Sequence, residues 1–397
     1  MRMDQLRAVL TPEGLRRLDE LGPLATTDHT ARAVSRLRTE GLDPDTVTAL
    51  VSQAHLRARG AAKFGDLAAG MLFTRAGLEQ STRPVVAARH AARFRDAGIG
   101  RVADLGCGIG GDSLGFAGLG MSVLAVDADE VTAAVAAYNL APFGDAVEVR
   151  HARAEDVDLG GVDAVWLDPA RRVAGHDAQA RVAASEYTPS LEWVFPLAAR
   201  TSAGIKLGPA FDRAEIPADA EAQWISVDGS TVELVLFTGT LARDGVRRAA
   251  LVIRGERVHE ITAAGDAPDV DARPMGAYLH EPEGAVIRAR LIGDVARALE
   301  AGTIDPHIAY LTSDAALTSP FVQSFRVRDE LPVATKPLAK ALRARGIGRL
   351  EIKKRGVDVD PAALRRALAL RGDESATLFV TRIGDRRVAL LADRVDD

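Results

Sequence analysis

The chain has 397 residues, of which 47% are hydrophobic and 26% charged, and this length predicts two or three domains rather than one core. No apolar run approaches the ~18 residues that a membrane-spanning helix needs, and residues 1–7 lack the apolar segment of a signal peptide. A single cysteine excludes an internal disulfide, so we expect a cytoplasmic protein that does not associate with membranes.

The net charge of −5 is unevenly distributed along the chain. Residues 321–397 hold 17 basic and 11 acidic side chains, so the rest of the chain is strongly acidic. A basic C-terminal module on an acidic body favours a polyanionic partner such as nucleic acid. The alternative is a solvated, arginine-rich surface without a partner.

The first 75 residues show helical patterns. Thr11 and Asp43 each precede a proline and are typical N-caps of helices. From Arg101 onward, apolar strands alternate with helical segments, and a strand pair turns around Asp228-Gly229. This alternation predicts an α/β, Rossmann-like fold with a parallel sheet and an antiparallel edge. The predicted strands are 102–105, 123–127, 147–150, 164–167, 203–207, 223–227 and 231–237.

The C-terminal third predicts a smaller α/β module. A hairpin is expected around Gly255, then a helix over 285–301 and a strand at 308–311. Further strands near Leu350 and Leu378, a helix over 361–370 and a hairpin at Gly384 complete the pattern. The sequence therefore predicts four parts: a helical region 1–75, an α/β domain 76–240, a hairpin and helix extension 241–319, and a small α/β domain 320–397.

A glycine-rich segment follows the first predicted strand of the α/β domain. Asp104 ends the strand, and Gly106, Gly108 and Gly110 follow at alternate positions, so a ligand can approach the backbone there. This spacing differs from the Gly-x-Gly-x-x-Gly of dinucleotide folds, and Asp104 would repel a pyrophosphate. The segment resembles the S-adenosylmethionine (SAM) loop of class I methyltransferases. The resemblance implies that Asp104, the three glycines and Asp112 hold the cofactor.

Acidic residues after the next two strands complete the predicted cofactor site. Asp127 ends an apolar strand 17 residues after Gly110, where an acid accepts hydrogen bonds from ribose hydroxyls. After the third strand, Arg153 stands where an adenine-binding Asp is usual. We therefore leave open whether Glu155 or Asp156 contacts the adenine amine.

The fourth strand ends in Asp168-Pro-Ala-Arg171-Arg172. This resembles the Asp/Asn-Pro-Pro-aromatic tetrad of nucleic-acid methyltransferases, which implies that Asp168 orients an acceptor amine toward the sulfonium methyl. Arg171 replaces the aromatic residue and can stack on a base or hold a phosphate. We predict Asp168, Arg171 and Lys206 as catalytic residues, Asp168 also as a cofactor contact, and Arg172 as substrate-binding. Lys206 ends the fifth strand, where a lysine can lie over the substrate.

Two other chemistries find little support in the sequence. Methylation at pyrimidine C5 needs a thiolate at the base, and Cys107 lies inside the glycine loop instead. The eight histidines show no metal-binding spacing, so we expect no metal. Ribose 2′-O-methylation remains an alternative, because Asp168, Lys206 and Glu233 follow that family's order. The further lysine of that family would have to be Lys63.

Two family resemblances extend these observations. Residues 104–139 are similar to the methyltransferase core of the trimethylguanosine synthase family, which methylates N2 of a cap guanine, although the stacking tryptophan of that family is missing. Most of the chain resembles bacterial class I SAM-dependent methyltransferases with a C-terminal THUMP-like domain. The matching segments are 79–81, 168–172, 206–207, 278–282, 311–314 and 354–356.

Because THUMP domains of RNA-modifying enzymes bind the RNA acceptor, this resemblance implies an RNA partner, tRNA or rRNA. We assign Glu79, Gln80, Lys353, Lys354 and Arg355 to substrate binding. The sequence thus predicts a SAM-dependent methyltransferase acting on a base nitrogen of RNA. Methylation of a protein or small molecule, and a non-catalytic RNA-binding protein that keeps SAM, remain alternatives. The RNA, the methylated atom and the oligomeric state stay open.

Overall fold

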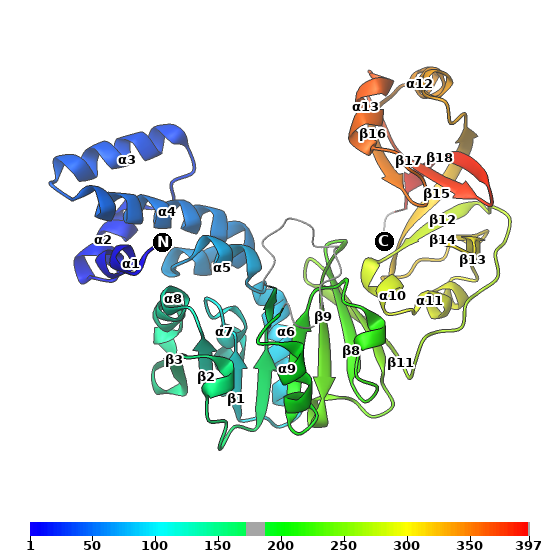
Figure 1. Ribbon diagram of the computed structural model, residues 1–397. Coiled ribbons are helices and arrows are strands. Elements are labelled where there is room, and N and C mark those ends of the chain that lie inside the picture. Colours follow the sequence, from blue (N-terminus) through cyan, green and yellow to red (C-terminus); the bar gives the residue numbers. More distant parts are fainter. Residues whose placement is uncertain (172–186, 396–397) are drawn as a thin grey trace. The chain divides into compact units, whose positions relative to one another are not determined.

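A computed structural model describes residues 1–171 and 187–395, with Arg171 described through its backbone alone (Figure 1). The chain forms two compact units. The first comprises residues 1–220 and 236–242, and the second comprises 221–235 and the residues from 243 onward. The four-part division inferred from the sequence stays a prediction.

The N-terminal region is helical, as the sequence predicts. The Thr11 hydroxyl accepts from the Gly14 amide at 2.9 Å, and Asp43 accepts from the Thr46 amide at 3.0 Å, so both predicted N-caps are confirmed. The longest helix, α4, is the centre of an apolar cluster that also includes Ile109 and Val135 of the α/β part. The elements are α1 (Met3–Val9), α2 (Pro12–Leu21), α3 (Thr27–Thr39), α4 (Pro44–Phe64), η1 (Gly65–Gly70) and α5 (Arg75–Gln80).

The first unit also contains a mostly parallel sheet, with strand order β3-β2-β1-β4-β7-β9. Strands β5 (Ala170–Arg171) and β6 (Tyr187–Thr188) form a separate two-stranded pair. The sheet strands are β1 (Arg101–Leu105), β2 (Ser122–Asp127), β3 (Val147–His151), β4 (Ala164–Leu167), β7 (Ser202–Leu207) and β9 (Ser230–Thr238). The helical segments between and after them are α6 (Pro84–Asp96), α7 (Gly111–Gly118), α8 (Glu130–Leu140), η2 (Ala141–Ala146), η3 (Ala154–Asp156), α9 (Leu191–Ala198), η5 (Arg213–Glu215) and η6 (Gly239–Leu241).

The register of these strands aligns their carboxyl ends. Leu105 of β1 is level with Val126 of β2 and with Leu167 of β4. The residues that follow these three positions therefore emerge together at one edge of the sheet. This edge carries the sequence motifs singled out above.

Strand β9 begins in the second unit, where the order is β11-β10-β8-β9. Strands β8 (Glu221–Val227) and β9 are joined by Asp228 (φ 48°) and Gly229 (φ 80°), a tight two-residue turn. Strand β10 (Arg248–Arg254) runs parallel to β8 and antiparallel to β11 (Arg257–Ala263). The predicted strand pair, the hairpin at Gly255 and the antiparallel edge are confirmed.

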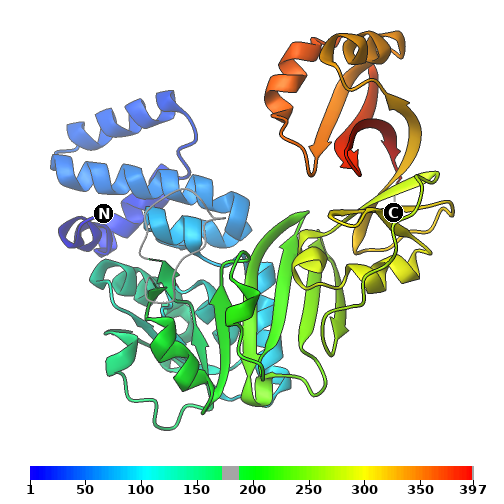
Figure 2. The ribbon, with the colours of Figure 1, turned by 45° about the vertical axis from the view of Figure 1, so that its right-hand side comes forward.

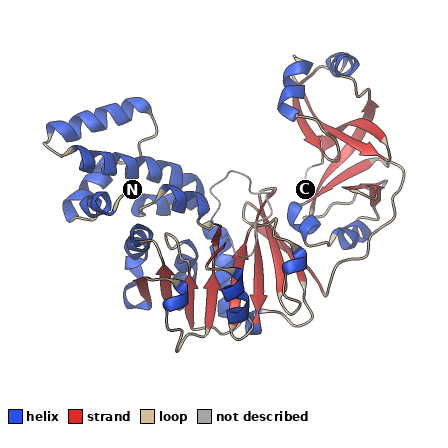
Figure 3. Cartoon of the chain, in the orientation of Figure 1, coloured by secondary structure: helices blue, strands red, loops and turns tan. Residues whose placement is uncertain are grey.

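The second unit also holds a seven-stranded sheet of order β13-β14-β12-β15-β18-β17-β16, shown with its helices in Figures 2 and 3. The predicted continuous helix over 285–301 is wrong, because Arg290 adopts φ 61° and separates two short helices. The strands are β12 (Tyr278–Pro282), β13 (Gly302–Asp305), β14 (Ile308–Ser313), β15 (Val322–Leu331), β16 (Ile347–Lys354), β17 (Glu374–Ile383) and β18 (Arg386–Arg394). The helices are α10 (Gly284–Arg288), α11 (Ile292–Ala298), α12 (Thr335–Ala344) and α13 (Pro361–Leu368). Across the described parts of the chain, no helix has both the length and the apolar character needed to cross a membrane.

A fully buried histidine joins three strands of this second sheet. His280 of β12 is within 2.9 Å of the hydroxyls of Ser324 and Ser313. The Ser313 hydroxyl donates to the Ala315 carbonyl, so Nε2–H of His280 donates to Ser313 and Nδ1 accepts from Ser324. Burial lowers the pKa of His280 from 6.5 to about 4.

We predict that His280→Gln lowers the melting temperature at pH 7, because loss of the buried hydrogen bonds lowers the free energy of unfolding by about 2 kcal/mol. The unfolded chain binds a proton near pH 6.5 and the folded chain near pH 4, so wild-type stability falls as pH drops between these values. Differential scanning fluorimetry from pH 7 to 4 should show a shallower fall in the variant. The control is His307→Gln, whose side chain is 80% exposed. Parallel curves for wild type and His280→Gln would contradict the linkage.

Candidate active site

The glycine loop at the carboxyl end of β1 has a backbone that only glycine adopts without strain. Gly106, Gly108 and Gly110 have φ angles of 97°, 56° and 89°. A Cβ on Gly106 would lie 2.9 Å from the Asp168 carbonyl oxygen, so glycine lets the ends of β1 and β4 meet. A Cβ on Gly108 would meet nothing within 4 Å, so the loop backbone there borders open space that a ligand can enter.

Asp104 lies beneath this loop and is 1% exposed. Its Oδ2 accepts from the Ser113 hydroxyl at 2.5 Å, and its buried Oδ1 has no hydrogen-bond partner among the described residues. Burial first, and then the nearby Asp112 carboxylate, raise the pKa of Asp104 well above its usual range. A buried acceptor without a partner is costly unless a donor arrives. The ammonium group of a ligand's amino-acid portion fits this requirement.

Asp127 lies on the other side of the loop. Its Oδ2 accepts from the Gly108 amide at 3.0 Å and its Oδ1 from the Asp129 amide at 2.9 Å, so two backbone amides fix the carboxylate. Burial raises the pKa of Asp127, and these two amides oppose the rise. A carboxylate held at the end of β2 is placed to accept hydrogen bonds from ribose hydroxyls. The loop and the two carboxylates therefore fit SAM.

A second group of polar side chains adjoins the loop at the ends of β4 and β7. The Lys206 ammonium donates to Asp168 Oδ2 at 2.6 Å and to the Thr82 hydroxyl at 3.0 Å, and lies 3.8 Å from Asp112 Oδ2. The structure thus brings together the predicted pair Asp168 and Lys206. It adds Thr82, whose only sequence signal is that it follows the matching segment 79–81.

Asp112 is buried on the far side of this group. The Thr82 hydroxyl donates to its Oδ2 at 2.6 Å, and Nδ1 of His90 lies 2.8 Å from its Oδ1. Burial alone would raise the pKa of Asp112, but Lys206, His90 and Thr82 outweigh it and lower the pKa to about 2. The carboxylate therefore stays ionised at neutral pH. Both oxygens of Asp112 contact protein groups. A contact between Asp112 and the cofactor stays a prediction.

The other predicted residues of the first unit make none of the contacts described above, or lie where their side chains are not described. Arg171 is in β5, and Arg172 lies outside the described residues. Glu155 in η3 forms an ion pair with Arg153 at 3.1 Å. Glu79 and Gln80 are exposed at the end of α5, where Glu79 lies 3.5 Å from Arg59.

The three predicted RNA-binding residues of the second unit differ in their surroundings. Lys353 pairs with Glu281 at 2.6 Å, and Arg355 donates to the Ala309 carbonyl at 2.9 Å. Lys354 is exposed. Their substrate roles stay predictions.

The side chain of Asn139 links the N-terminal helical region to the glycine loop through hydrogen bonds. The amide of Asn139 in α8 donates to the carbonyls of Leu72 and Ile109 at 3.0 and 2.9 Å and accepts from the Leu72 amide at 2.8 Å. In addition, a Cβ on Gly77 of α5 would lie 2.4 Å from Ile109. The helical region is therefore part of the wall around the loop.

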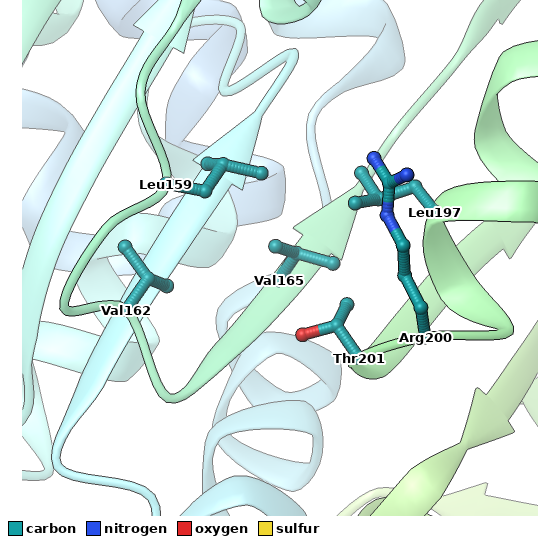
Figure 4. A pocket seen from close by; sticks show the side chains of 6 residues that line it. All are labelled: Leu159, Val162, Val165, Leu197, Arg200 and Thr201. Carbon is teal, nitrogen blue, oxygen red and sulfur yellow. The ribbon is translucent and has the colours of Figure 1, made fainter.

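A shallow hollow in the first unit lies elsewhere. Its lining comes from the amino ends of β4 and β7 and from the end of α9, so it faces the opposite edge of the sheet from the glycine loop (Figure 4). The residues that line the hollow are Leu159, Val162, Val165, Leu197, Arg200 and Thr201.

The described residues contain no group of three or more His, Cys, Asp or Glu side chains that could hold a metal ion.

Comparison with known proteins identifies the family. An uncharacterized SAM-dependent methyltransferase, found in two strains of Mycobacterium tuberculosis, is 34% identical over 347 residues, covering 84% of this chain and 92% of that protein. This chain is a SAM-dependent methyltransferase. The crystal structure of a putative methyltransferase from Porphyromonas gingivalis shares the fold, with a TM-score of 0.68 at 20% identity over 94% of this chain and 100% of that one.

Two family matches cover the ends of the methyltransferase. Residues 322–394 match the THUMP domain-like family, and residues 2–60 match a domain of unknown function. The expected class I fold, the SAM cofactor and the THUMP-like C-terminal domain are thus confirmed.

We predict that Asp127→Ala weakens SAM binding about 10- to 100-fold, because it removes the carboxylate that accepts from the Gly108 amide and that we expect to bond the ribose. Isothermal titration calorimetry with SAM measures this. Asp163→Ala is the matched control: that carboxylate also accepts from two backbone amides, of Gly100 and Arg101, but at the amino end of β1. Equal affinities for Asp127→Ala and wild type would refute the ribose role.

Proposed function

We propose that this methyltransferase transfers the methyl group of SAM to a base nitrogen of RNA, in tRNA or rRNA. The observation that carries the proposal is the position of Asp168. Its carbonyl oxygen would lie 2.9 Å from a Cβ on Gly106, so Asp168 borders the loop that fits the methionine end of SAM. An amine hydrogen-bonded to the Asp168 carboxylate would lie beside the sulfonium.

SAM, when bound, supplies a methyl group on a sulfonium that is already a good electrophile, so the protein contributes mainly position. Asp168 accepts a hydrogen bond from an N–H of the acceptor amine and directs the nitrogen lone pair. Lys206 donates to Asp168 Oδ2 and fixes the carboxylate. Asp104 holds the amino-acid end of the cofactor, and Asp127 holds its ribose.

The THUMP-like module supports RNA as the acceptor. Its helix α12 carries Lys336 and Lys340 one turn apart, both exposed, while Leu338 and Leu342 are buried on the opposite side. Within the described residues neither lysine makes an ion pair, and residues 331–350 contain no acidic side chain. An unneutralised cationic face attracts the phosphates of a nucleic-acid backbone.

Ribose 2′-O-methylation is the second candidate, favoured by the 2.6 Å contact between Lys206 and Asp168. The upstream lysine that it would need, Lys63, donates instead to the carbonyls of Leu78 and Glu79 at the end of α5. The base nitrogen is therefore the better supported acceptor.

Asp168→Ala should abolish methyl transfer while calorimetric SAM affinity stays within about threefold of wild type, because Asp168 contacts the acceptor. The measurement is nucleoside mass spectrometry of RNA from a deletion strain complemented with wild type or variant. We expect one base-methylated nucleoside that Asp168→Ala does not restore. The exposed Asp158→Ala is the control and should restore it. A missing 2′-O-methyl nucleoside would favour the second candidate, and an unchanged RNA profile would exclude RNA as acceptor.

Charge reversal of the α12 face tests the RNA contact. Lys336→Glu with Lys340→Glu should weaken binding to total tRNA about tenfold or more at 100 mM salt and reduce the slope of log K against log salt by about two. Filter binding across a salt series measures both quantities. The control is Arg32→Glu with Arg36→Glu in α3, an exposed pair with the same spacing and charge change. Equal losses of tRNA affinity in both double variants would show that the exposed face of α12 contributes no more to RNA binding than the exposed pair in α3.

A further inference from the structure

We propose that Thr82 is a positioning residue of the methyl-transfer site, which fixes Lys206 and through it Asp168. The inference rests on the proposed acceptor role of Asp168. Thr82 lies in the short segment between α5 and α6, outside the glycine loop and the strand ends. It is 4% exposed, and its hydroxyl contacts both Asp112 and Lys206.

The direction of each hydrogen bond in this group follows from the number of protons available. A threonine hydroxyl has one proton, and the ammonium of Lys206 has donors only. The Thr82 hydroxyl must therefore accept from Lys206, and its own proton goes to Asp112 Oδ2 at 2.6 Å. In this arrangement a lone pair of the Thr82 hydroxyl points at Lys206. The two hydrogen bonds cannot exchange direction, because the ammonium group cannot accept one.

Asp112 holds the Thr82 hydroxyl in this orientation. Its carboxylate is ionised at neutral pH, so it always accepts the Thr82 proton. Its other oxygen is bound by His90, which is 1% exposed and lies against Trp166 with ring centroids 4.4 Å apart. The order from the core outward is thus His90, Asp112, Thr82, Lys206, Asp168.

The backbone around Thr82 is built for close approach. A Cβ on Gly111 would lie 3.3 Å from Ser81 Cβ and 3.4 Å from the Thr82 amide, and a Cβ on Gly115 would lie 2.7 Å from the Ala87 carbonyl. Of these two glycines, one turn apart on α7, Gly111 lets the segment before α6 approach the site and Gly115 lets α6 itself pack closely on α7. Gly111 and Gly115 are therefore part of how Thr82 is placed.

Thr82 does not serve the helix that follows it. A threonine near a helix start usually caps the backbone amides, but the N-cap of α6 is Arg83, and no side chain caps it. The Thr82 hydroxyl is directed at Asp112 and Lys206 instead. A purely local role in starting α6 is therefore excluded by the contacts.

The test compares Thr82→Val, Thr82→Ser and Thr238→Val in the full-length protein. Valine keeps the shape of threonine and removes the hydroxyl, whereas serine keeps it. Thr238 is the matched control, since it is also 4% exposed and donates to the Ala198 carbonyl at 2.8 Å, away from the site. Methyl transfer from tritiated SAM to total RNA of a deletion strain gives kcat and KM, and calorimetry gives SAM affinity.

A second measurement does not depend on activity. The chain has six lysines, so lysine-selective 15N labelling gives a simple ammonium spectrum, with the Lys206 signal assigned by its absence in Lys206→Arg. Lys206 is 12% exposed and hydrogen-bonded, so its ammonium should exchange slowly enough to be seen. Lys353, 20% exposed and paired with Glu281, is an internal reference.

We expect Thr82→Val to lower kcat about 10- to 100-fold, to leave SAM affinity and the Lys353 signal unchanged, and to broaden or remove the Lys206 signal. Thr82→Ser should restore both kcat and signal, and Thr238→Val should change neither. An unchanged kcat in Thr82→Val overturns the inference. It is also overturned if Thr82→Val keeps the Lys206 signal and loses thermal stability and SAM affinity in step with kcat, because that pattern shows general destabilisation of the protein. If wild type methylates no RNA while the Lys206 signal still depends on Thr82, the proposed function fails and the positioning role stands.

Discussion

The site depends on burying several carboxylates at one edge of a sheet. Asp112 and Asp168 both raise the pKa of Asp104, and the ammonium of Lys206 lies 2.6 Å from Asp168 and 3.8 Å from Asp112. The surroundings then divide the acids into two kinds. Asp112, held by protein donors, has its pKa lowered to about 2, whereas the pKa of Asp104 is raised by burial and by its neighbours. Asp104, whose Oδ1 has no donor among the described residues, is the acid beside the open loop, where the ammonium group of a ligand would supply that donor.

The N-terminal helices are a structural component of this site. The Asn139 side chain donates hydrogen bonds to the carbonyls of Leu72 and of Ile109 in the glycine loop. Helix α5 packs so closely on Ile109 that only glycine fits at position 77. Thr82 is the second residue after α5, so the same packing that holds the loop also places the hydroxyl that contacts Lys206. Loss of these helices would therefore remove part of the site, although none of the expected catalytic residues lies in them.

The sequence predicts the first unit well because its signals are local. The alternation of apolar strands and helices gives the parallel sheet, and the Asp-x-Gly-x-Gly-x-Gly spacing gives the loop. Sequence order alone could not reveal Thr82, because its role arises from hydrogen bonds to α7 and β7 across 30 and 124 residues. The helix over 285–301 was wrong for another reason: its apolar pattern continues through Arg290, whose left-handed backbone is set by the surrounding fold.

The basic C-terminal module shows why a run of cations in the sequence does not define a binding surface. Residues 353–355 run along and just beyond an extended strand, so consecutive side chains alternate in direction: Lys353 and Arg355 turn to protein acceptors and Lys354 to solvent. In α12 the spacing of four residues places Lys336 and Lys340 on one exposed face instead. Because phosphate attraction needs charges that are not already neutralised, the helix is better suited to contact the RNA that we propose as acceptor than the strand with the higher density of basic residues.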